Sequence, residues 1–201
     1  MTIRAIIFDI GGVLNSVQPT RSVRAWESHL GLAEGQLLPL VFDNQMSQRS
    51  SLGQATRQEI WDFVNRQLRL PPADFSKLQA DVWGCYWWDM DLLTFIRSLR
   101  PRCKTAILSN AWVDARLEMQ DHINDDTFDV IVYSSEEGLL KADPEIYRRT
   151  LQRLTVAPAE AIFVDDMPRN VRAAEALGIH GILFTGSLAV QEQIRRLLKS
   201  P

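Results

Sequence analysis

Residues 3–12 of the chain read Ile-Arg-Ala-Ile-Ile-Phe-Asp-Ile-Gly-Gly, and this stretch decides the fold. Its apolar run is continuous rather than alternating, which predicts a strand buried on both faces of a sheet. The run ends in Asp9, and the glycines that follow, Gly11 and Gly12, permit a tight turn and the close approach of a ligand. Ligands of open parallel sheets lie beyond the carboxyl ends of the strands, so Asp9 is predicted to lie at a functional edge.

The composition is that of an ordinary soluble domain, with 201 residues, 46% hydrophobic and 23% charged. The 22 Lys and Arg against 25 Asp and Glu give a net charge of −3, which offers no basis for a nucleic-acid or membrane partner. We find no apolar run that could span a bilayer and no signal peptide. Cys85 and Cys103 have neither metal-ligand spacing nor the density of a disulfide framework. We therefore expect a cytoplasmic protein that is a monomer or a small homo-oligomer.

A long helical block follows the first strand. Apolar residues recur at helical spacing over residues 20–30, 34–42, 56–70 and 74–88, with prolines and Gly31 as stops. The pattern predicts no strand between residues 15 and 100. The block therefore reads as a set of helices inserted after the first strand.

Beyond this block the chain alternates between the two kinds of element. We expect strands over residues 105–108, 128–133, 161–164 and 181–184, and helices over residues 89–99, 113–123, 143–154 and 168–178, with a further helix at the end of the chain. Such alternation predicts an α/β fold, a Rossmann-like doubly wound parallel sheet covered by helices on both faces.

Three of the predicted strands end in polar groups: Asp9, Ser109-Asn110 and Asp165-Asp166. Lys141 stands in a loop immediately before a helix. Taken singly, each has an ordinary explanation as a strand terminator, a helix cap, a turn or a surface lysine. Because all four segments fall on one edge of one sheet, their coincidence favours a functional site.

The residue types in these four segments are suited to one kind of chemistry. Asp9 and Asp165-Asp166 gather hard oxygen ligands, which suit Mg²⁺. Ser109, Asn110 and Lys141 supply hydrogen-bond donors and a positive charge, which suit a phosphoryl group. A carboxylate beside a cation and such donors can act as a nucleophile toward phosphorus.

These segments resemble the four ordered motifs of the haloacid dehalogenase-like hydrolase superfamily. The matching stretches are Phe8–Leu14, Leu108–Asn110, Lys141–Tyr147, and Phe163–Asp166 with Asn170. The resemblance covers nearly the whole chain and implies a catalytic core of residues 1–16 and 89–201 with a helical cap domain at 17–88. Within the superfamily the chain looks most similar to small phosphatases with a helical cap, including sugar-1-phosphate phosphatases.

The resemblance implies that Asp9 is the nucleophile that forms an aspartyl-phosphate. Ser109 and the Asn110 backbone would hold the phosphate, and Lys141 would neutralise charge in the transition state.

The same resemblance implies that Mg²⁺ is bound by Asp9, by Asp166 and by the main-chain carbonyl of Gly11. It leaves two roles for Asp165, as a metal ligand or as the partner of Lys141. Asn170 would support these residues without meeting the metal.

Gly11 departs from the pattern of many phosphatases in the superfamily, which carry a second Asp there as general acid and base. Glycine keeps the carbonyl ligand but removes a proton donor, and general acid–base catalysis is worth roughly 10²–10⁴-fold. Some sugar-1-phosphate phosphatases look similar at this position, and an anomeric leaving group needs less protonation than a primary alkoxide. The expected substrate is a small phosphorylated metabolite, with a sugar 1-phosphate as one candidate.

Two alternatives stay open. A 2-haloacid dehalogenase-type hydrolase also uses a nucleophilic Asp, but it needs no metal and leaves Asp165-Asp166 unexplained. A catalytically impaired binding or scaffold protein would account for Gly11. The intact residues of the motifs argue against it, namely Asp9, Ser109, Lys141 and Asp166.

Tryptophans gather at the end of the helical block, at Trp83, Trp87 and Trp88. Aromatic residues at helical spacing are more often core than binding surface. The alternative is that one of them lines a crevice between the helical block and the sheet.

Overall fold

The computed structural model describes residues 2–199, which contain one five-stranded parallel sheet of order β5-β4-β1-β6-β7. The strand at its centre, β1, is the opening stretch of the sequence. The strands of this sheet are β1 (Ala5–Phe8), β4 (Lys104–Ser109), β5 (Val130–Tyr133), β6 (Ala161–Asp165) and β7 (His180–Leu183).

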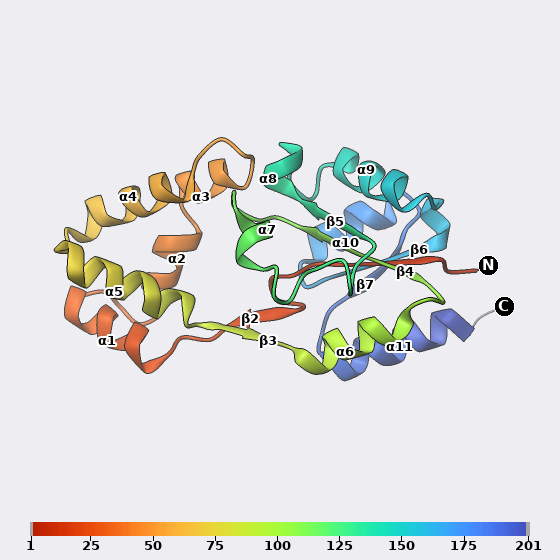
Figure 1. Cartoon of the computed structure of the whole chain (residues 1–201), viewed down its shortest axis with the longest axis horizontal. Coiled ribbons are helices and arrows are strands. Elements are labelled where there is room, and N and C mark those ends of the chain that lie inside the picture. The colour runs from red at the N-terminus through yellow and green to blue at the C-terminus, as the bar shows by residue number, and fades with distance from the viewer. Residues whose placement is uncertain (1, 200–201) are drawn as a thin grey trace.

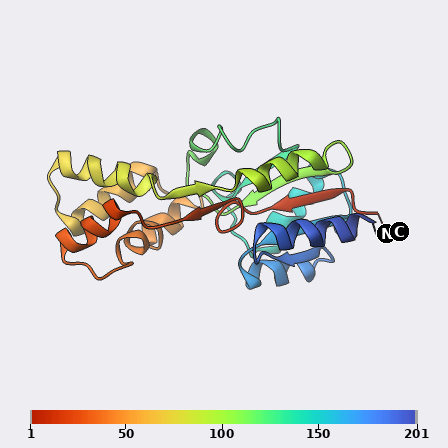
Figure 2. The ribbon, with the colours of Figure 1, turned by 90° about the horizontal axis from the view of Figure 1, so that it is seen from below.

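Helices cover both faces of the sheet, with α6 (Met90–Leu99) and α11 (Ser187–Lys199) on one face and α9 (Pro144–Leu154) and α10 (Pro168–Glu175) on the other (Figures 1 and 2). Asp89 caps α6, and Asp143 followed by Pro144 begins α9, as the sequence predicts. The expected Rossmann-like α/β sheet is confirmed. No helix within residues 2–199 combines the length and the apolar character needed to cross a membrane.

Strand β1 is buried on both faces and joins two hydrophobic clusters. Ile6 and Phe8 pack in the cluster that includes α6 and α11, whereas Ala5 and Ile7 pack in the cluster that includes α9 and α10. Alternate side chains of one strand therefore hold both helical layers, which explains why its apolar run has no polar alternation.

The helices α1 to α5 form a unit of their own beside the sheet, here called the helical insert (Figure 1). They pack around a separate hydrophobic cluster that includes Trp26, Ile60 and Leu78. The helices are α1 (Arg21–Leu30), α2 (Leu37–Phe42), α3 (Gln45–Ser50), α4 (Arg57–Leu68) and α5 (Pro72–Trp83).

The insert is joined to the sheet by two short antiparallel strands, β2 (Asn15–Val17) and β3 (Tyr86–Trp88). The prediction that residues 15–100 hold no strand is therefore wrong. The helix predicted over residues 74–88, which corresponds to α5, also does not extend to residue 88. The helix ends at Trp83, with Gly84 as its C-cap. A three-residue strand with half-buried, exposed and half-buried side chains is too short to show a period, so its aromatic residues read as a helical stripe.

Other boundaries also differ from expectation. A four-residue helix α7 (Ala115–Glu118) replaces the helix expected over residues 113–123, since Asp114 before it is left-handed and a run of polar residues follows. Helix α3 was not expected, although Asn44 caps it. Two short segments complete the element list: α8 (Ser134–Glu137) and the 3₁₀ turn Pro158–Glu160.

Residues of the core that follow β4 and β5 hold the α3 end of the insert. The Ser134 hydroxyl donates to the Ser51 carbonyl at 2.6 Å, and the Val113 N–H donates to the Ser50 hydroxyl at 3.2 Å. An ion pair joins Arg57 of α4 to Glu118 of α7. The insert is thus fixed over the edge where β4 and β5 end.

Gly53 offers a test of this docking. Its φ is +74°, and a Cβ there would lie 2.4 Å from the Ser135 carbonyl oxygen. Gly35 has φ of +83° with no described atom within 4 Å of its Cβ position. We expect Gly35→Ala to cost about 1–2 kcal/mol of unfolding free energy from backbone strain alone. Gly53→Ala should cost clearly more in urea unfolding, because the Ser135 backbone must also move; equal losses would contradict the close approach.

Candidate active site

Three neighbouring strands bring their polar ends to one edge of the sheet. Asp9 follows β1 directly, and Ser109 and Asp165 are the last residues of β4 and β6, which flank β1. The Asp9 N–H donates to the Val164 carbonyl at 2.9 Å, which extends the pairing with β6 past the strand end. Because the strands are parallel, their carboxyl ends meet here, and Asp9 lies in the middle.

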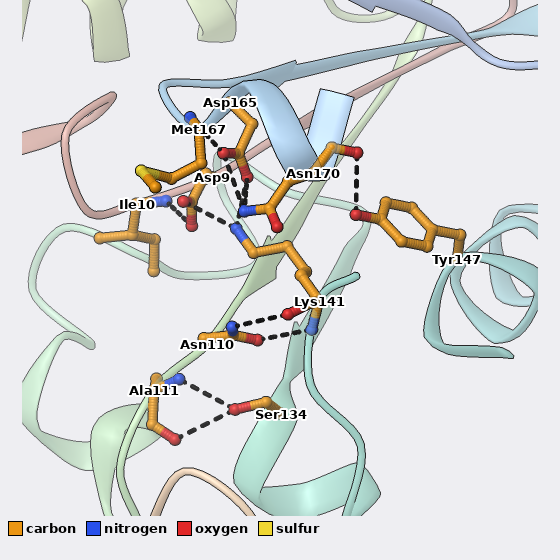
Figure 3. Close-up of polar contacts among 10 residues, drawn as sticks. All are labelled: Asp9, Ile10, Asn110, Ala111, Ser134, Lys141, Tyr147, Asp165, Met167 and Asn170. Carbon is orange, nitrogen blue, oxygen red and sulfur yellow. Dashed lines mark hydrogen bonds and ion pairs between the residues drawn. The ribbon is translucent and has the colours of Figure 1, made fainter. Parts of the chain in front are cut away.

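Lys141 lies between two buried carboxylates (Figure 3). Its Nζ is 2.7 Å from Asp9 Oδ2 and 2.6 Å from Asp165 Oδ2, and its side chain is 1% exposed. Asn110 fixes the loop that carries it, since the Lys141 N–H donates to Asn110 Oδ1 at 2.8 Å and Asn110 Nδ2 donates to the Lys141 carbonyl at 3.3 Å. A buried ammonium is tolerated because both of its neighbours carry the opposite charge.

Asp165 has both carboxylate oxygens engaged by protein donors. Oδ1 accepts from the Met167 N–H at 2.8 Å and from Asn170 Nδ2 at 3.0 Å, and Oδ2 accepts from Lys141 and from Asn170 Nδ2 at 3.1 Å. The Asn170 carbonyl accepts in turn from the Tyr147 hydroxyl at 3.0 Å (Figure 3). This arrangement favours the second of the two roles left open for Asp165, that of holding Lys141.

The two glycines of the first motif differ in what surrounds them. At Gly12, where φ is +74°, a Cβ would lie 2.3 Å from Asp166 Oδ2, so the absence of a side chain leaves room for that carboxylate. At Gly11 a Cβ would meet no described atom within 4 Å. Glycine is therefore favoured at position 12 both by its positive φ and by the closeness of Asp166, whereas Gly11 faces open space.

The site carries an excess of negative charge. Among the described residues, Asp9, Asp165 and Asp166 can bring carboxylate oxygens within 4.8 Å of one another. Three carboxylates and the Lys141 ammonium sum to −2 when all are ionised (−3 + 1). Two excess negative charges on hard oxygen ligands fit a divalent cation such as Mg²⁺.

The pKa values reflect this crowding. Burial raises the pKa of Asp9 to about 6, and Asp165 adds to the rise, while Lys141 and the Ser109 hydroxyl oppose it. Burial, together with the charge of Asp165, also raises the pKa of Asp166.

The site residues predicted from the sequence all lie at this edge: Asp9, Gly11, Ser109, Asn110, Lys141, Asp165, Asp166 and Asn170. Gly11, Ser109 and Asn110 line a cavity of about 560 Å³ that extends from the sheet edge to the helical insert.

The sequence did not reveal most of the far walls of this cavity. Phe42, Trp83, Tyr86 and Trp112 line it, together with Arg57 and Glu118. Of the tryptophans weighed from the sequence, Trp83 does line the crevice. Trp87 is 59% exposed, and Trp88 stacks on His122 at 4.4 Å between ring centroids. No spacing could have shown this set, because its members come from separate segments.

Comparison with known proteins agrees with this fold and gives the family. The family model described as haloacid dehalogenase-like hydrolase matches residues 3–178, so the chain belongs to that family.

Among curated proteins, the sesquiterpene phosphatase astK of Aspergillus oryzae is 28% identical over 98% of this chain and 97% of its own length. The phosphorylated carbohydrates phosphatase of Thermotoga maritima is 29% identical over 89% of this chain and 83% of its own. The chain spans only 19% of another relative, the mouse acyl-CoA dehydrogenase family member 10.

Among solved structures, a HAD family enzyme of Bacteroides thetaiotaomicron, crystallised with magnesium and inorganic phosphate, superposes with a TM-score of 0.74 at 20% identity. The match covers 90% of this chain and 93% of that one, and at this identity it establishes the shared fold.

The raised pKa of Asp9 predicts competition between protons and a bound cation. With a pKa of about 6, about half of the Asp9 carboxylates carry a proton at pH 6 and about 1% at pH 8. As a ligand of Mg²⁺, the role predicted for it from the sequence, Asp9 would lose that proton on binding, so the affinity for Mg²⁺ should rise as pH increases through 6 and then level off. Calorimetry in two buffers of different ionisation enthalpy should show proton release on Mg²⁺ binding at pH 6 that largely vanishes at pH 8. Proton release that is the same at pH 6 and pH 8 would contradict a raised pKa of Asp9 at the metal site.

Proposed function

We propose that this hydrolase is a Mg²⁺-dependent phosphomonoesterase that acts on a small phosphorylated metabolite through an aspartyl-phosphate on Asp9. The observation that carries the proposal is the Asp9 carboxylate at the sheet edge, 2.7 Å from the Lys141 ammonium and beside two further carboxylates. The Asp9 carboxylate is held in one position, and its burial keeps water from solvating it, so it is suited to act as a nucleophile.

The proposed reaction has two steps. One Asp9 oxygen attacks phosphorus, the bond from phosphorus to the ester oxygen breaks, and the departing alkoxide takes a proton from water to become the alcohol. Water then attacks the aspartyl-phosphate and releases inorganic phosphate. Ser109 and the Asn110 backbone are suited to hold the phosphoryl oxygens, and Lys141 offsets the charge that develops on them.

For the metal we propose Asp9, Asp166 and the Gly11 carbonyl as ligands. Asp165 is assigned to positioning Lys141, because its two oxygens accept four hydrogen bonds, from Lys141, the Met167 N–H and twice from Asn170. Asp9 is less occupied, with the Ile10 N–H on Oδ1 and Lys141 on Oδ2. Bound Mg²⁺ would offset the repulsion between the Asp9 carboxylate and the phosphate of the substrate.

The relatives support a phosphatase but differ in the alcohol that their names give. The Aspergillus relative is named for a sesquiterpene and the Thermotoga relative for phosphorylated carbohydrates. We propose that the helical insert, expected at residues 17–88, serves as the cap that selects the alcohol. A cytoplasmic location and a monomeric or small oligomeric state stay predictions.

The alternatives drawn from the sequence are less well supported. A metal-independent dehalogenase gives no reason for the placement of Asp166 against Gly12, which brings a third carboxylate to the site. A catalytically impaired scaffold gives no reason to keep Lys141 buried between Asp9 and Asp165, since unused buried charges are costly.

One assay separates these functions. Phosphate release from 4-nitrophenyl phosphate should require Mg²⁺, stop with EDTA, and fall by at least about 10³-fold in Asp9→Asn, which removes the nucleophile. Asp62→Asn, an exposed position on α4, serves as the matched control and should retain full activity. Metal-independent chloride release from a 2-haloacid would indicate the dehalogenase, and turnover of neither compound would indicate the scaffold.

Gly11 allows a second test, because its Cβ direction is open. If the missing proton donor limits the enzyme, wild type should hydrolyse a sugar 1-phosphate faster than a sugar 6-phosphate, whose alkoxide is the poorer leaving group. Gly11→Asp should then raise the rate on the 6-phosphate by up to roughly 10²–10⁴-fold, and Gly11→Asn, of equal size but unable to act as an acid, should not. No gain in Gly11→Asp with Mg²⁺ binding intact would show that protonation is not limiting.

A further inference from the structure

The cavity that extends from the sheet edge to the helical insert has a chemical character of its own. Resting on the proposed function, we infer that its occupant is the apolar alcohol part of a phosphate monoester, of alkyl, prenyl or aryl type, rather than a sugar or another polyol. The cavity volume of about 560 Å³ lies within the range of roughly 300–1,000 Å³ typical of sites that enclose a whole small molecule.

Aromatic rings form one wall. Trp83 stacks on Tyr86 with centroids 5.6 Å apart, and Phe42 lies 5.3 Å from Trp112 and 6.0 Å from Trp83. These rings come from α5, β3, the end of α2 and the loop after β4, and all four line the cavity. Tyr86 is half-buried in this wall, and burial raises the pKa of its phenol. Contacts between packed rings hold this wall in shape.

Aliphatic side chains extend the apolar surface. Ile10, Val17, Leu38, Pro39, Val113 and Met119 line the same space. Gly11 adds no side chain to it. Apart from the phosphate-holding end at Ser109 and Asn110, the lining is therefore dominated by groups that offer no hydrogen bond.

Few polar side chains line the far walls of the cavity, and some of them already bind other protein groups. Arg57 is ion-paired with Glu118 and lies 5.8 Å from the centroid of the Trp83 ring. The Ser51 hydroxyl donates to the Ser47 carbonyl at 3.1 Å.

Asn15 and Asp43 also line the cavity, and the aromatic wall adds one polar atom per ring in the Tyr86 hydroxyl and in the indole N–H groups of Trp83 and Trp112. A second phosphate group on the substrate would be repelled by the Asp43 carboxylate, and the Arg57 guanidinium is already paired with Glu118. The cavity therefore favours a substrate with a single phosphate.

Desolvation decides between the two kinds of alcohol. Each hydroxyl of a polyol gives up hydrogen bonds to water on entry and must regain them from the protein, and unpaired groups weaken binding. An alkyl or aryl group loses nothing comparable and gains by leaving water. An apolar alcohol therefore matches these walls better than a sugar.

The test compares two primary phosphate esters whose leaving groups are chemically alike: octyl phosphate, used below its micelle concentration, and ribitol 5-phosphate. We expect kcat/KM for octyl phosphate to exceed that for ribitol 5-phosphate by at least about tenfold. Equal values, or a preference for ribitol 5-phosphate, would overturn the inference while leaving the proposed phosphatase intact. If 4-nitrophenyl phosphate is not hydrolysed either, the proposed function fails, and the inference fails with it.

Variants of the cavity lining test whether the preference for octyl phosphate arises in this cavity. Trp112→Ala should lower kcat/KM for octyl phosphate by at least about fivefold and leave ribitol 5-phosphate little changed. Trp87→Ala removes an equally large ring that is 59% exposed and lines no part of this cavity, so it should change neither value. Met119→Gln keeps the size of the side chain and adds polarity, and it should act in the same direction as Trp112→Ala. Parallel losses on both substrates in Trp112→Ala and Met119→Gln would overturn the assignment.

Discussion

The placement of Lys141 between two buried carboxylates constrains the rest of the structure. An ammonium held out of water is stable only while its partners stay within hydrogen-bond distance, and those partners follow or end two adjacent strands, β1 and β6. Asn110, just after β4, holds the loop that delivers the lysine. The charged cluster therefore requires β1 at the centre of the sheet with β4 and β6 on either side, which is the observed order.

Charge and apolar surface are divided between different parts of the chain. The sheet edge carries the carboxylates, the lysine and the donors, all fixed by backbone pairing and short hydrogen bonds. The cavity beyond it takes its walls from the insert and from loops, which are fixed by the Ser134 and Ser50 contacts and by the ion pair of Arg57. A reacting phosphate and the alcohol attached to it would thus meet surfaces of opposite character.

The sequence predicted what local pattern can encode. Continuous apolar runs located the strands of the parallel sheet, and the residues directly after them gave Asp9, Ser109 and Asp165. The sequence did not predict features that depend on contacts between distant segments or on very short elements. Strand β3 is too short to show a period, and the aromatic wall joins segments separated along the chain. The difference between Gly11 and Gly12 depends on where the Asp166 carboxylate lies, which no spacing reveals.

The aromatic residues that line the cavity lie on none of the strands of the parallel sheet. If the proposed reaction takes place at the sheet edge, mutations among these aromatic residues would change which alcohol fits while the carboxylates and the lysine at the edge stay as they are. Copies of such a gene could therefore diverge in substrate preference through changes in the insert and loops, with the residues of the sheet edge unchanged.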